Sequence, residues 1–237
     1  MSGPKDPVIT GCIECTEEAQ RFAPTETVYL QPYAWEPGLG CNGTDVWNLT
    51  AGDDETEVWR EDNYCGGIAL TDLDYKDFEF NGSFVPLDTD DDYIGFFFGY
   101  EDPGHFYLVV AGGDWDTHAS YGNDTWRLVK VSSETSTSSS EMMRAIYSGV
   151  DVPGQTSILY RPEIKGWNKD HAYSWSLKYE PSKNSLLVSV YQDDTQLWNS
   201  IWDKTFDEEK VEGKVGVFTD SQPTRFYDMN VKSLCSV

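Results

Sequence analysis

Four aspartates gather just ahead of an aromatic segment of the sequence. The stretch "PLDTDDDYIGFFFGYE" occupies residues 86–101, and its acidic side chains are Asp88, Asp90, Asp91 and Asp92. If the segment is extended, alternate side chains point to one side, so the first, second and last of these would converge. Calcium takes about six to eight oxygen ligands from carboxylates, carbonyls and water. These residues therefore fit either a calcium site or a turn whose charges all face water. The run lacks the glycine and glutamate of an EF-hand loop.

Two further acidic stretches could hold an ion. The segment "TDLDYKDFEF" contains Asp72, Asp74, Asp77 and Glu79, and we expect it to face the first cluster from a neighbouring strand. Asp74 is the best second-site ligand, and the others are better explained as exposed strand residues. A third stretch, "GGDWDTHASYGND", is predicted to be one loop that binds a metal or a sugar, or is simply acidic; its polar members are Asp114, Asp116, His118 and Asp124.

The sequence gives little support to catalysis. Glycoside hydrolysis needs two carboxylates about 5–9.5 Å apart with one of them in an apolar pocket, and acidic residues are too abundant here for any pair to stand out. A serine triad needs a positioned histidine. The three histidines, His105, His118 and His171, lie in predicted turns or strand ends, where a shared zinc ion is a weaker interpretation than surface residues. We therefore expect a non-catalytic protein, with a hydrolase or lyase as an alternative.

Net charge narrows the range of partners. The chain has 237 residues, with 41 Asp and Glu against 17 Lys and Arg, for a net charge of -24. Such a field repels nucleic acid phosphates and anionic lipids, and it also strains the compact state. Bound divalent cations would relieve that strain, although acidity alone also keeps proteins soluble. No apolar run approaches the about 20 residues that span a membrane, and no signal peptide is visible.

Glycosylation triplets and cysteines indicate an extracellular protein. Four Asn-x-Ser/Thr acceptors begin at Asn42, Asn48, Asn81 and Asn123. The positions of the five cysteines suggest local disulfides plus one disulfide that joins the two ends of the chain. The cysteines are Cys12, Cys15, Cys41, Cys65 and Cys235. A Cys41–Cys65 bridge would contribute about 3–4 kcal/mol in the chain-entropy model. An odd cysteine remains, which leaves a covalent dimer open.

Short β-favouring segments, separated by turn residues, fill the chain from Thr25 onward. "HAYSWSLKYEP" alternates, so one face of that strand is buried, whereas "YIGFFFGY" is apolar on both faces and should be central. Two hairpins are predicted: "YIGFFFGY" with "HFYLVV", and "SLLVSVYQD" with "QLWNSIWD". The one helix candidate covers residues 141–147. We expect an extended lead-in over residues 1–24 and a single jelly-roll sandwich of two antiparallel sheets over residues 25–237.

The nine tryptophans divide into two groups. We expect the core to contain those in strand patterns, namely Trp167, Trp175, Trp198 and Trp202. The others lie in less predictable segments, where an exposed pair could stack on sugar rings; they are Trp35, Trp47, Trp59, Trp115 and Trp126.

Three stretches carry a family resemblance. "GGIALTDLDYKDFEFNGSF" through "HFYLVV", then "PGQTSILYRPEIKGWNKDHAYSWSLKYEP", and the ending "IWDKTFDEEKVEGKVGVFTDSQPTRFYDMNVKSLC" together resemble the lectin-like C-terminal domain of thrombospondins. The likeness covers about residues 25–235. It implies a concanavalin-like jelly roll that binds Ca²⁺ and serves adhesion in the extracellular matrix. It also implies a disulfide from Cys235 to Cys12 or Cys15.

The resemblance favours the ion over the solvated turn at the first aspartate run. We therefore predict a secreted, calcium-binding adhesion module that binds an extracellular protein or glycan without catalysis. A calcium-dependent carbohydrate-binding lectin is the alternative, with sugar held by the loop from Asp114 to Asp124 and a nearby tryptophan.

Overall fold

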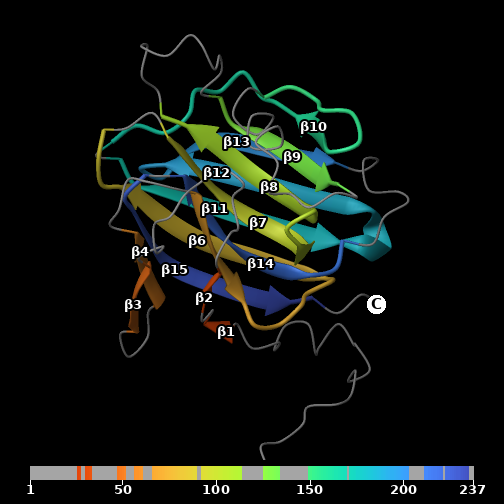
Figure 1. Cartoon of the computed structure of the whole chain (residues 1–237), viewed down its shortest axis with the longest axis horizontal. Coiled ribbons are helices and arrows are strands. Elements are labelled where there is room, and N and C mark those ends of the chain that lie inside the picture. The colour runs from red at the N-terminus through yellow and green to blue at the C-terminus, as the bar shows by residue number, and fades with distance from the viewer. Residues whose placement is uncertain are drawn as a thin grey trace, which may run out of the picture.

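In the computed structural model, most of the described residues form strands in two antiparallel sheets, which lie one over the other (Figure 1). The structure describes residues 26–27, 30–33, 47–51, 56–60, 66–89, 92–113, 125–133, 149–169, 171–202, 211–220 and 222–234. The one helical element in this part of the chain is the 3-10 turn η1 (Pro181–Lys183). The predicted helix over residues 141–147 and the lead-in over residues 1–24 lie outside the described residues.

Sheet A has eight strands in the order β13-β12-β11-β6-β15-β4-β3, with β1 paired to β15. Its strands are β1 (Glu26–Thr27), β3 (Trp47–Ala51), β4 (Thr56–Arg60), β6 (Phe78–Pro86), β11 (Tyr173–Glu180), β12 (Ser185–Gln192), β13 (Thr195–Trp202) and β15 (Thr224–Ser233). The last strand of the chain therefore lies beside β6 in the middle of the sheet, which is a long-range pairing typical of a jelly roll.

Sheet B has seven strands in the order β10-β9-β8-β7-β14-β5-β2. Its strands are β2 (Leu30–Tyr33), β5 (Gly66–Thr71), β7 (Tyr93–Asp102), β8 (His105–Gly112), β9 (Arg127–Ser132), β10 (Thr156–Tyr160) and β14 (Lys214–Asp220). β7 is the fourth of the seven, as its apolar sequence predicted, because a strand buried on both faces must be flanked and covered on all sides.

The pattern of buried and exposed side chains differs between the two sheets because one face of sheet A is exposed to solvent. β6 and β11 alternate strictly between buried and partly exposed positions, which confirms the prediction for "HAYSWSLKYEP". In β7, the side chains of Phe96 and Phe98 enter the core between the sheets, whereas Phe97 joins a second buried cluster on the other face of sheet B. Both faces of β7, in the middle of sheet B, are therefore buried.

Trp175 of β11 is at the centre of the core between the sheets. Its ring stacks on Phe96 of sheet B, with centroids 5.0 Å apart and an interplanar angle of 9°. Gly82 of β6 lies directly opposite, and a Cβ there would fall 2.3 Å from the Trp175 ring. A glycine is required at this position because the tryptophan occupies the space of any side chain.

Both predicted hairpins are confirmed. β7 and β8 pair around the turn at Pro103 and Gly104. β12 and β13 pair around Asp193 and Asp194, whose φ angles of 46° and 65° are those of a type I′ turn. This turn type matches the twist of the flanking strands and tolerates Asp at left-handed positions.

The tryptophan predictions have a mixed outcome. Trp167, Trp175 and Trp198 are in the core, as expected. Trp126 was expected among the candidates for sugar stacking, but it is fully buried and packs against Trp198, so that expectation is wrong. Side chains of Trp47, Trp59 and Trp202 are not described, and the remaining two, Trp35 and Trp115, lie outside the described residues.

Candidate functional site

The acid loop, residues 87–92, connects β6 of sheet A to β7 of sheet B. Asp88 is exposed, and its Oδ1 accepts a hydrogen bond of 2.7 Å from the Thr89 N–H. Asp92 is half-buried at the start of β7. Asp90 and Asp91, two of the four predicted ligands, lie outside the described residues. The structure therefore describes one carboxylate before the centre of the loop, that of Asp88, and one after it, that of Asp92.

A buried glutamine reaches this loop from the connection between β14 and β15. The side chain of Gln222 is fully buried, and its Nε2 donates to the carbonyl oxygens of Asp88 and Pro223, both at 3.1 Å. The Oε1 of the same amide is buried and meets no donor among the described residues. A buried acceptor left without a partner costs about 1–3 kcal/mol. The site therefore contains one oxygen that requires a donor, a water or a cation.

Backbone hydrogen bonds hold both ends of the acid loop. The Leu87 N–H donates to Pro223 O at 2.9 Å, and the Gly113 N–H donates to Asp92 O at 3.2 Å. The loop is thus attached to the residue before β15 of sheet A and to the residue after β8 of sheet B. Such anchoring limits the rearrangement that a ligand would have to induce.

The described residues fit part of a calcium shell. Carboxylates of Asp88 and Asp92 and the neutral Oε1 of Gln222 are all oxygen donors of the kinds that calcium prefers. Within the described part of the chain, no three acidic, histidine or cysteine side chains are grouped closely enough to hold a metal by themselves. A complete shell would need the loop centre, with Asp90 and Asp91, in addition to backbone and water oxygens.

Asp74 lies far from the acid loop. It precedes β6, whereas Asp88 follows it, and the nine residues of that strand span roughly 26 Å at about 3.3 Å per residue. The expectation that the 72–79 segment faces the first cluster is therefore not met. Asp74 instead lies 3.6 Å from Lys214 Nζ in an exposed ion pair.

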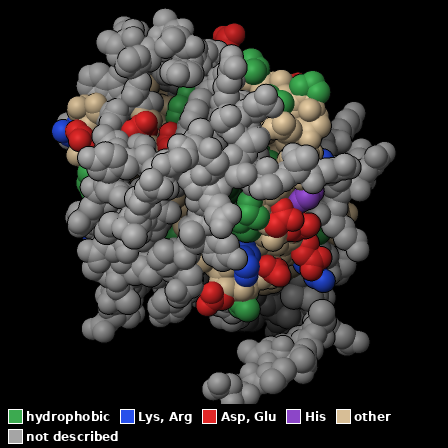
Figure 2. Space-filling view, in the orientation of Figure 1, with side chains coloured by type: hydrophobic (Ala, Val, Ile, Leu, Met, Phe, Trp, Pro, Cys, Tyr) green, Lys and Arg blue, Asp and Glu red, His purple; other side chains and the backbone are tan. Residues whose placement is uncertain are grey.

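An open groove, which we call the end groove, lies at this opposite end of the sandwich. It has a volume of about 570 Å³, and its charged and titratable lining is Glu101, His105, Lys130 and Glu212. An adjoining hollow of about 510 Å³ shares both glutamates and adds Asp74 and Lys214. Acidic side chains gather beside a histidine on the face shown in Figure 2, with basic side chains at the edge of the group. The end groove thus combines charges of both signs in a water-accessible hollow.

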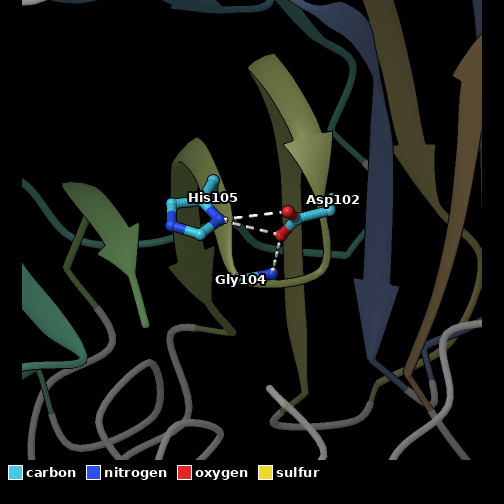
Figure 3. A network of polar contacts seen from close by, with 3 residues as sticks. All are labelled: Asp102, Gly104 and His105. Carbon is cyan, nitrogen blue, oxygen red and sulfur yellow. Dashed lines mark hydrogen bonds and ion pairs between the residues drawn. The ribbon is translucent and has the colours of Figure 1, made fainter. Parts of the chain in front are cut away.

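The turn between β7 and β8 borders the end groove. His105 Nδ1 lies 3.0 and 3.1 Å from the two carboxylate oxygens of Asp102, and the Gly104 N–H donates to Asp102 Oδ1 at 2.6 Å (Figure 3). Burial raises the pKa of Asp102, but the hydrogen bonds from His105 and Gly104 outweigh it, so the pKa lies below its ordinary value of 3.8. The carboxylate thus orders the turn while it remains charged.

His171 makes an equivalent pair at the other end of the molecule. Its Nδ1 contacts Asp193 Oδ2, while Asp193 Oδ1 accepts from the Ala172 N–H at 3.1 Å. The hydrogen bond from His171, aided by that from Ala172, lowers the pKa of Asp193. His105 and His171 belong to opposite ends of the strands, so these two cannot share a zinc ion; His118 lies outside the described residues.

Glu101 and Glu212 place two carboxylates in one groove, which is the arrangement that would favour glycoside hydrolysis. Both side chains are exposed. A general acid of that chemistry is held in an apolar pocket, which keeps it protonated. The groove therefore has the charge of such a site but lacks the environment that the reaction requires.

Asn81 is the one glycosylation candidate with a described side chain. It lies on the solvent-facing side of β6, where its Nδ2 is 3.3 Å from Glu79 Oε1 and 3.3 Å from Asn230 Oδ1. Asn48 is in β3, whereas Asn42 and Asn123 lie outside the described residues. The same holds for all five cysteines and for the predicted loop from Asp114 to Asp124.

Gln222 is the residue that sequence reasoning missed. It lies in the short turn "SQP" between two predicted strands, 134 positions from Asp88. No spacing in the sequence relates the two residues, because their proximity follows from the pairing of β15 with β6, where Thr224 lies opposite Pro86. The one local feature that marks Gln222 is its long polar side chain between Thr219 and Thr224. The hydroxyls of both threonines donate to the backbone oxygen of Gln222.

The chain matches the family model described as "Thrombospondin C-terminal region" over residues 44–236. It belongs to the thrombospondin C-terminal family. Among its relatives, thrombospondin-1 of Xenopus laevis is 31% identical over 180 residues, which are 72% of this chain and 15% of that protein. Cartilage oligomeric matrix protein of Rattus norvegicus is 29% identical over 175 residues, 70% of this chain and 23% of the relative. This thrombospondin C-terminal domain thus spans less than a quarter of the length of either relative.

Solved structures place the domain among lectin-like jelly rolls. The carbohydrate binding module CBM66 from Bacillus subtilis superposes with a TM-score of 0.50 at 14% identity, covering 80% of this chain and 92% of that one. The carbohydrate recognition domain of Emp46p, in its metal-free form, gives 0.50 at 9% identity, covering 81% and 88%. These likenesses confirm the predicted fold class. In the described part of the chain, no helix is long and apolar enough to cross a bilayer.

Proposed function

We propose that this thrombospondin C-terminal domain is a secreted, non-catalytic module that binds calcium at the acid loop and recognises an extracellular protein or glycan. The observation that carries the calcium proposal is the buried Oε1 of Gln222, which lies on an amide anchored to the Asp88 carbonyl. The family to which the chain belongs supports an extracellular recognition role, and the net charge of -24 favours a cationic ligand.

Calcium would act mainly on structure. The ligands supplied by this chain are Asp88 and Asp92, with Asp90 and Asp91 from the loop centre and the amide oxygen of Gln222. A divalent ion there neutralises charges that otherwise repel one another at short range. Because both ends of the loop are already anchored, the ion would fix the centre of the loop and the surface around it. Asp74, beside Lys214 in the hollow that adjoins the end groove, would belong to a separate and weaker site.

Glycan binding is the second candidate. The lectin-like fold and a groove with polar groups of both signs support it, since sugar hydroxyls are bound by carboxylates and amides on such scaffolds. Two of the proteins with the same fold are named for carbohydrate binding or recognition, but at identities of 14% and 9% only the fold is shared. A glycan array and a panel of matrix proteins, each probed with and without Ca²⁺, separate the two partners.

The calcium proposal is tested by calorimetric titration of the chelator-treated protein. We expect wild type to bind Ca²⁺ with a measurable heat, and an Asp88→Asn, Asp92→Asn double variant to bind at least tenfold more weakly. Asp228→Asn is the matched control, because Asp228 is an exposed acid of β15 and asparagine tolerates its φ of 53°. Equal affinity of all three proteins would place the ion elsewhere, and the absence of any heat in wild type would refute calcium binding.

A further inference from the structure

The glycosylation triplet Asn81-Gly82-Ser83 lies in the middle of β6, which is flanked by β11 on one side and by β15 on the other. Successive side chains of a strand point to opposite faces, so the two residues that the modification requires, Asn81 and Ser83, share the outer face of sheet A. Both are half-buried there, whereas Gly82 faces the core, where the Trp175 ring leaves no room for a side chain. The acceptor asparagine therefore lies on a rigid central strand rather than on a loop.

Polar side chains of the two neighbouring strands surround the acceptor on this face. Ser176 of β11 lies opposite Asn81, and Asn230 of β15 lies opposite it on the other side, with its Oδ1 3.3 Å from Asn81 Nδ2. The pairing of the strands places one row with a tyrosine at each end on one side of these residues and a row of charged side chains on the other. In order across the sheet, the rows are Tyr191, Ser174, Ser83 and Tyr227, and Lys178, Glu79 and Lys232. The acceptor is thus enclosed by hydrogen-bonding groups and by two aromatic rings.

The modification of Asn81 must precede the closing of sheet A, because β6 is hydrogen-bonded along both edges in the folded domain. Its partner strands begin at Tyr173 and Thr224, so they are synthesised after β6 and leave the acceptor accessible in the growing chain. In the transfer, Nδ2 loses one proton to a base of the host transferase and forms a bond to C1 of the first N-acetylglucosamine. The bond from C1 to the lipid pyrophosphate donor breaks, and the lipid pyrophosphate leaves. The remaining N–H can then keep one of its two present contacts, with Glu79 Oε1 or with Asn230 Oδ1.

We infer that the first sugars of a glycan on Asn81 lie against the outer face of sheet A and cover it, instead of extending into solvent. A rigid attachment point reduces the conformational freedom that the sugars lose when they pack on the strands. The covalent bond also holds the sugars at a high effective concentration beside the sheet, so weak contacts are sufficient. Hydroxyl and amide groups of β11, β6 and β15 can hydrogen-bond the sugars, and the tyrosine rings supply apolar surface. The extracellular partner would then bind a different surface of the domain.

The experiment uses the domain secreted from eukaryotic cells, with the Asn81 glycan followed by mass spectrometry of the chymotryptic peptide that ends at Phe84. An endoglycosidase that cleaves between the first two sugars should act on the native domain at about one tenth of its rate on denatured protein or more slowly, because it reaches only the minor state in which the sugars have left the sheet. Ser176→Lys places a long charged side chain beside the acceptor and should raise the native release rate about threefold or more. Ser157→Lys is the matched control, because Ser157 is an exposed strand residue of sheet B, and it should leave the rate unchanged.

The possible outcomes are distinct. Slow native release that Ser176→Lys alone accelerates supports the inference. An unmodified Asn81 peptide overturns it, and so does native release at the rate of denatured protein. Release that neither lysine variant changes, or that both accelerate equally, overturns it as well, because the protection would then not come from contacts around the acceptor. If Ser176→Lys does not fold, Ser174→Lys takes its place, since Ser174 lies opposite Ser83 on the same face. None of these results depends on whether the domain binds calcium.

Discussion

Replacing Gly82 by alanine tests the packing around Trp175 in the core between the sheets. The added Cβ would lie 2.3 and 2.4 Å from two atoms of the Trp175 ring and 3.0 Å from Met229 Cγ. Non-bonded carbon atoms prefer about 3.5–4.0 Å, so the overlap exceeds 1 Å. The ring cannot simply move away, because it stacks on Phe96 and meets Phe80 edge-on at 5.5 Å between centroids.

The expected loss of stability follows from two opposing terms. Overpacking of a filled core costs about 1–3 kcal/mol, and an overlap this large belongs at the upper end. Alanine regains about 0.5–1 kcal/mol because glycine loses more backbone entropy on folding. A net loss of about 2 kcal/mol should lower the melting temperature by about 4–8 °C for a domain of this size. Calorimetry of Gly82→Ala measures it, with the solvent-facing Ser176→Ala of β11 as control, expected within about 0.5 kcal/mol of wild type. An alanine variant that melts at or above the wild-type temperature would refute the packing argument.

Three further predictions concern the turns and the outer face of sheet A. Because the pKa of Asp102 is lowered in the folded state, the charged carboxylate stabilises the fold at pH values above the unfolded-state pKa, and this stabilisation is lost as the pH falls through the folded-state pKa. The melting temperature of Asp102→Asn should therefore depend less on pH than that of wild type between about pH 5 and pH 2. An unchanged pH dependence would contradict this. Asn81→Gln, expressed through a eukaryotic secretory pathway, should lose one glycan and gain mobility on a denaturing gel, whereas identical mobility would show that Asn81 carries none. Asp194→Gly removes the strain of a left-handed backbone conformation, with φ of 65°, at a residue other than glycine. It should raise the free energy of unfolding, measured in urea, by about 0.5–1 kcal/mol. A lower free energy of unfolding than that of wild type would contradict this prediction.

Local patterns predicted the strands because burial alternates along a sheet. The period of two in "HAYSWSLKYEP" identifies β11 and its buried face, and the unbroken apolar run of β7 identifies a central strand. The hairpin turns were equally local, since the Asp193–Asp194 pair itself favours positive φ angles. Trp126 was misplaced because it directly precedes β9, where no alternation distinguishes a buried ring from an exposed one.

The candidate site was predicted only in part because its members meet through pairings between distant segments. The aspartate run was visible as composition, but its contact with Gln222 depends on β15 lying beside β6, which no local pattern encodes. Asp74 looked close to the run in sequence, yet the intervening strand carries it to the opposite end of the sandwich. Strand length, rather than residue type, separated these two groups of acids.

Thermal melting of the domain with and without Ca²⁺ tests the central claim most directly. An ion that binds only the folded state adds RT ln(1+[Ca]/Kd), which is about 2.7 kcal/mol at a hundredfold excess over Kd. For a domain of this size, that corresponds to a rise of about 5–11 °C relative to the protein in chelator at equal ionic strength. We predict this rise for wild type. Superimposable melting curves across the calcium titration would contradict the account.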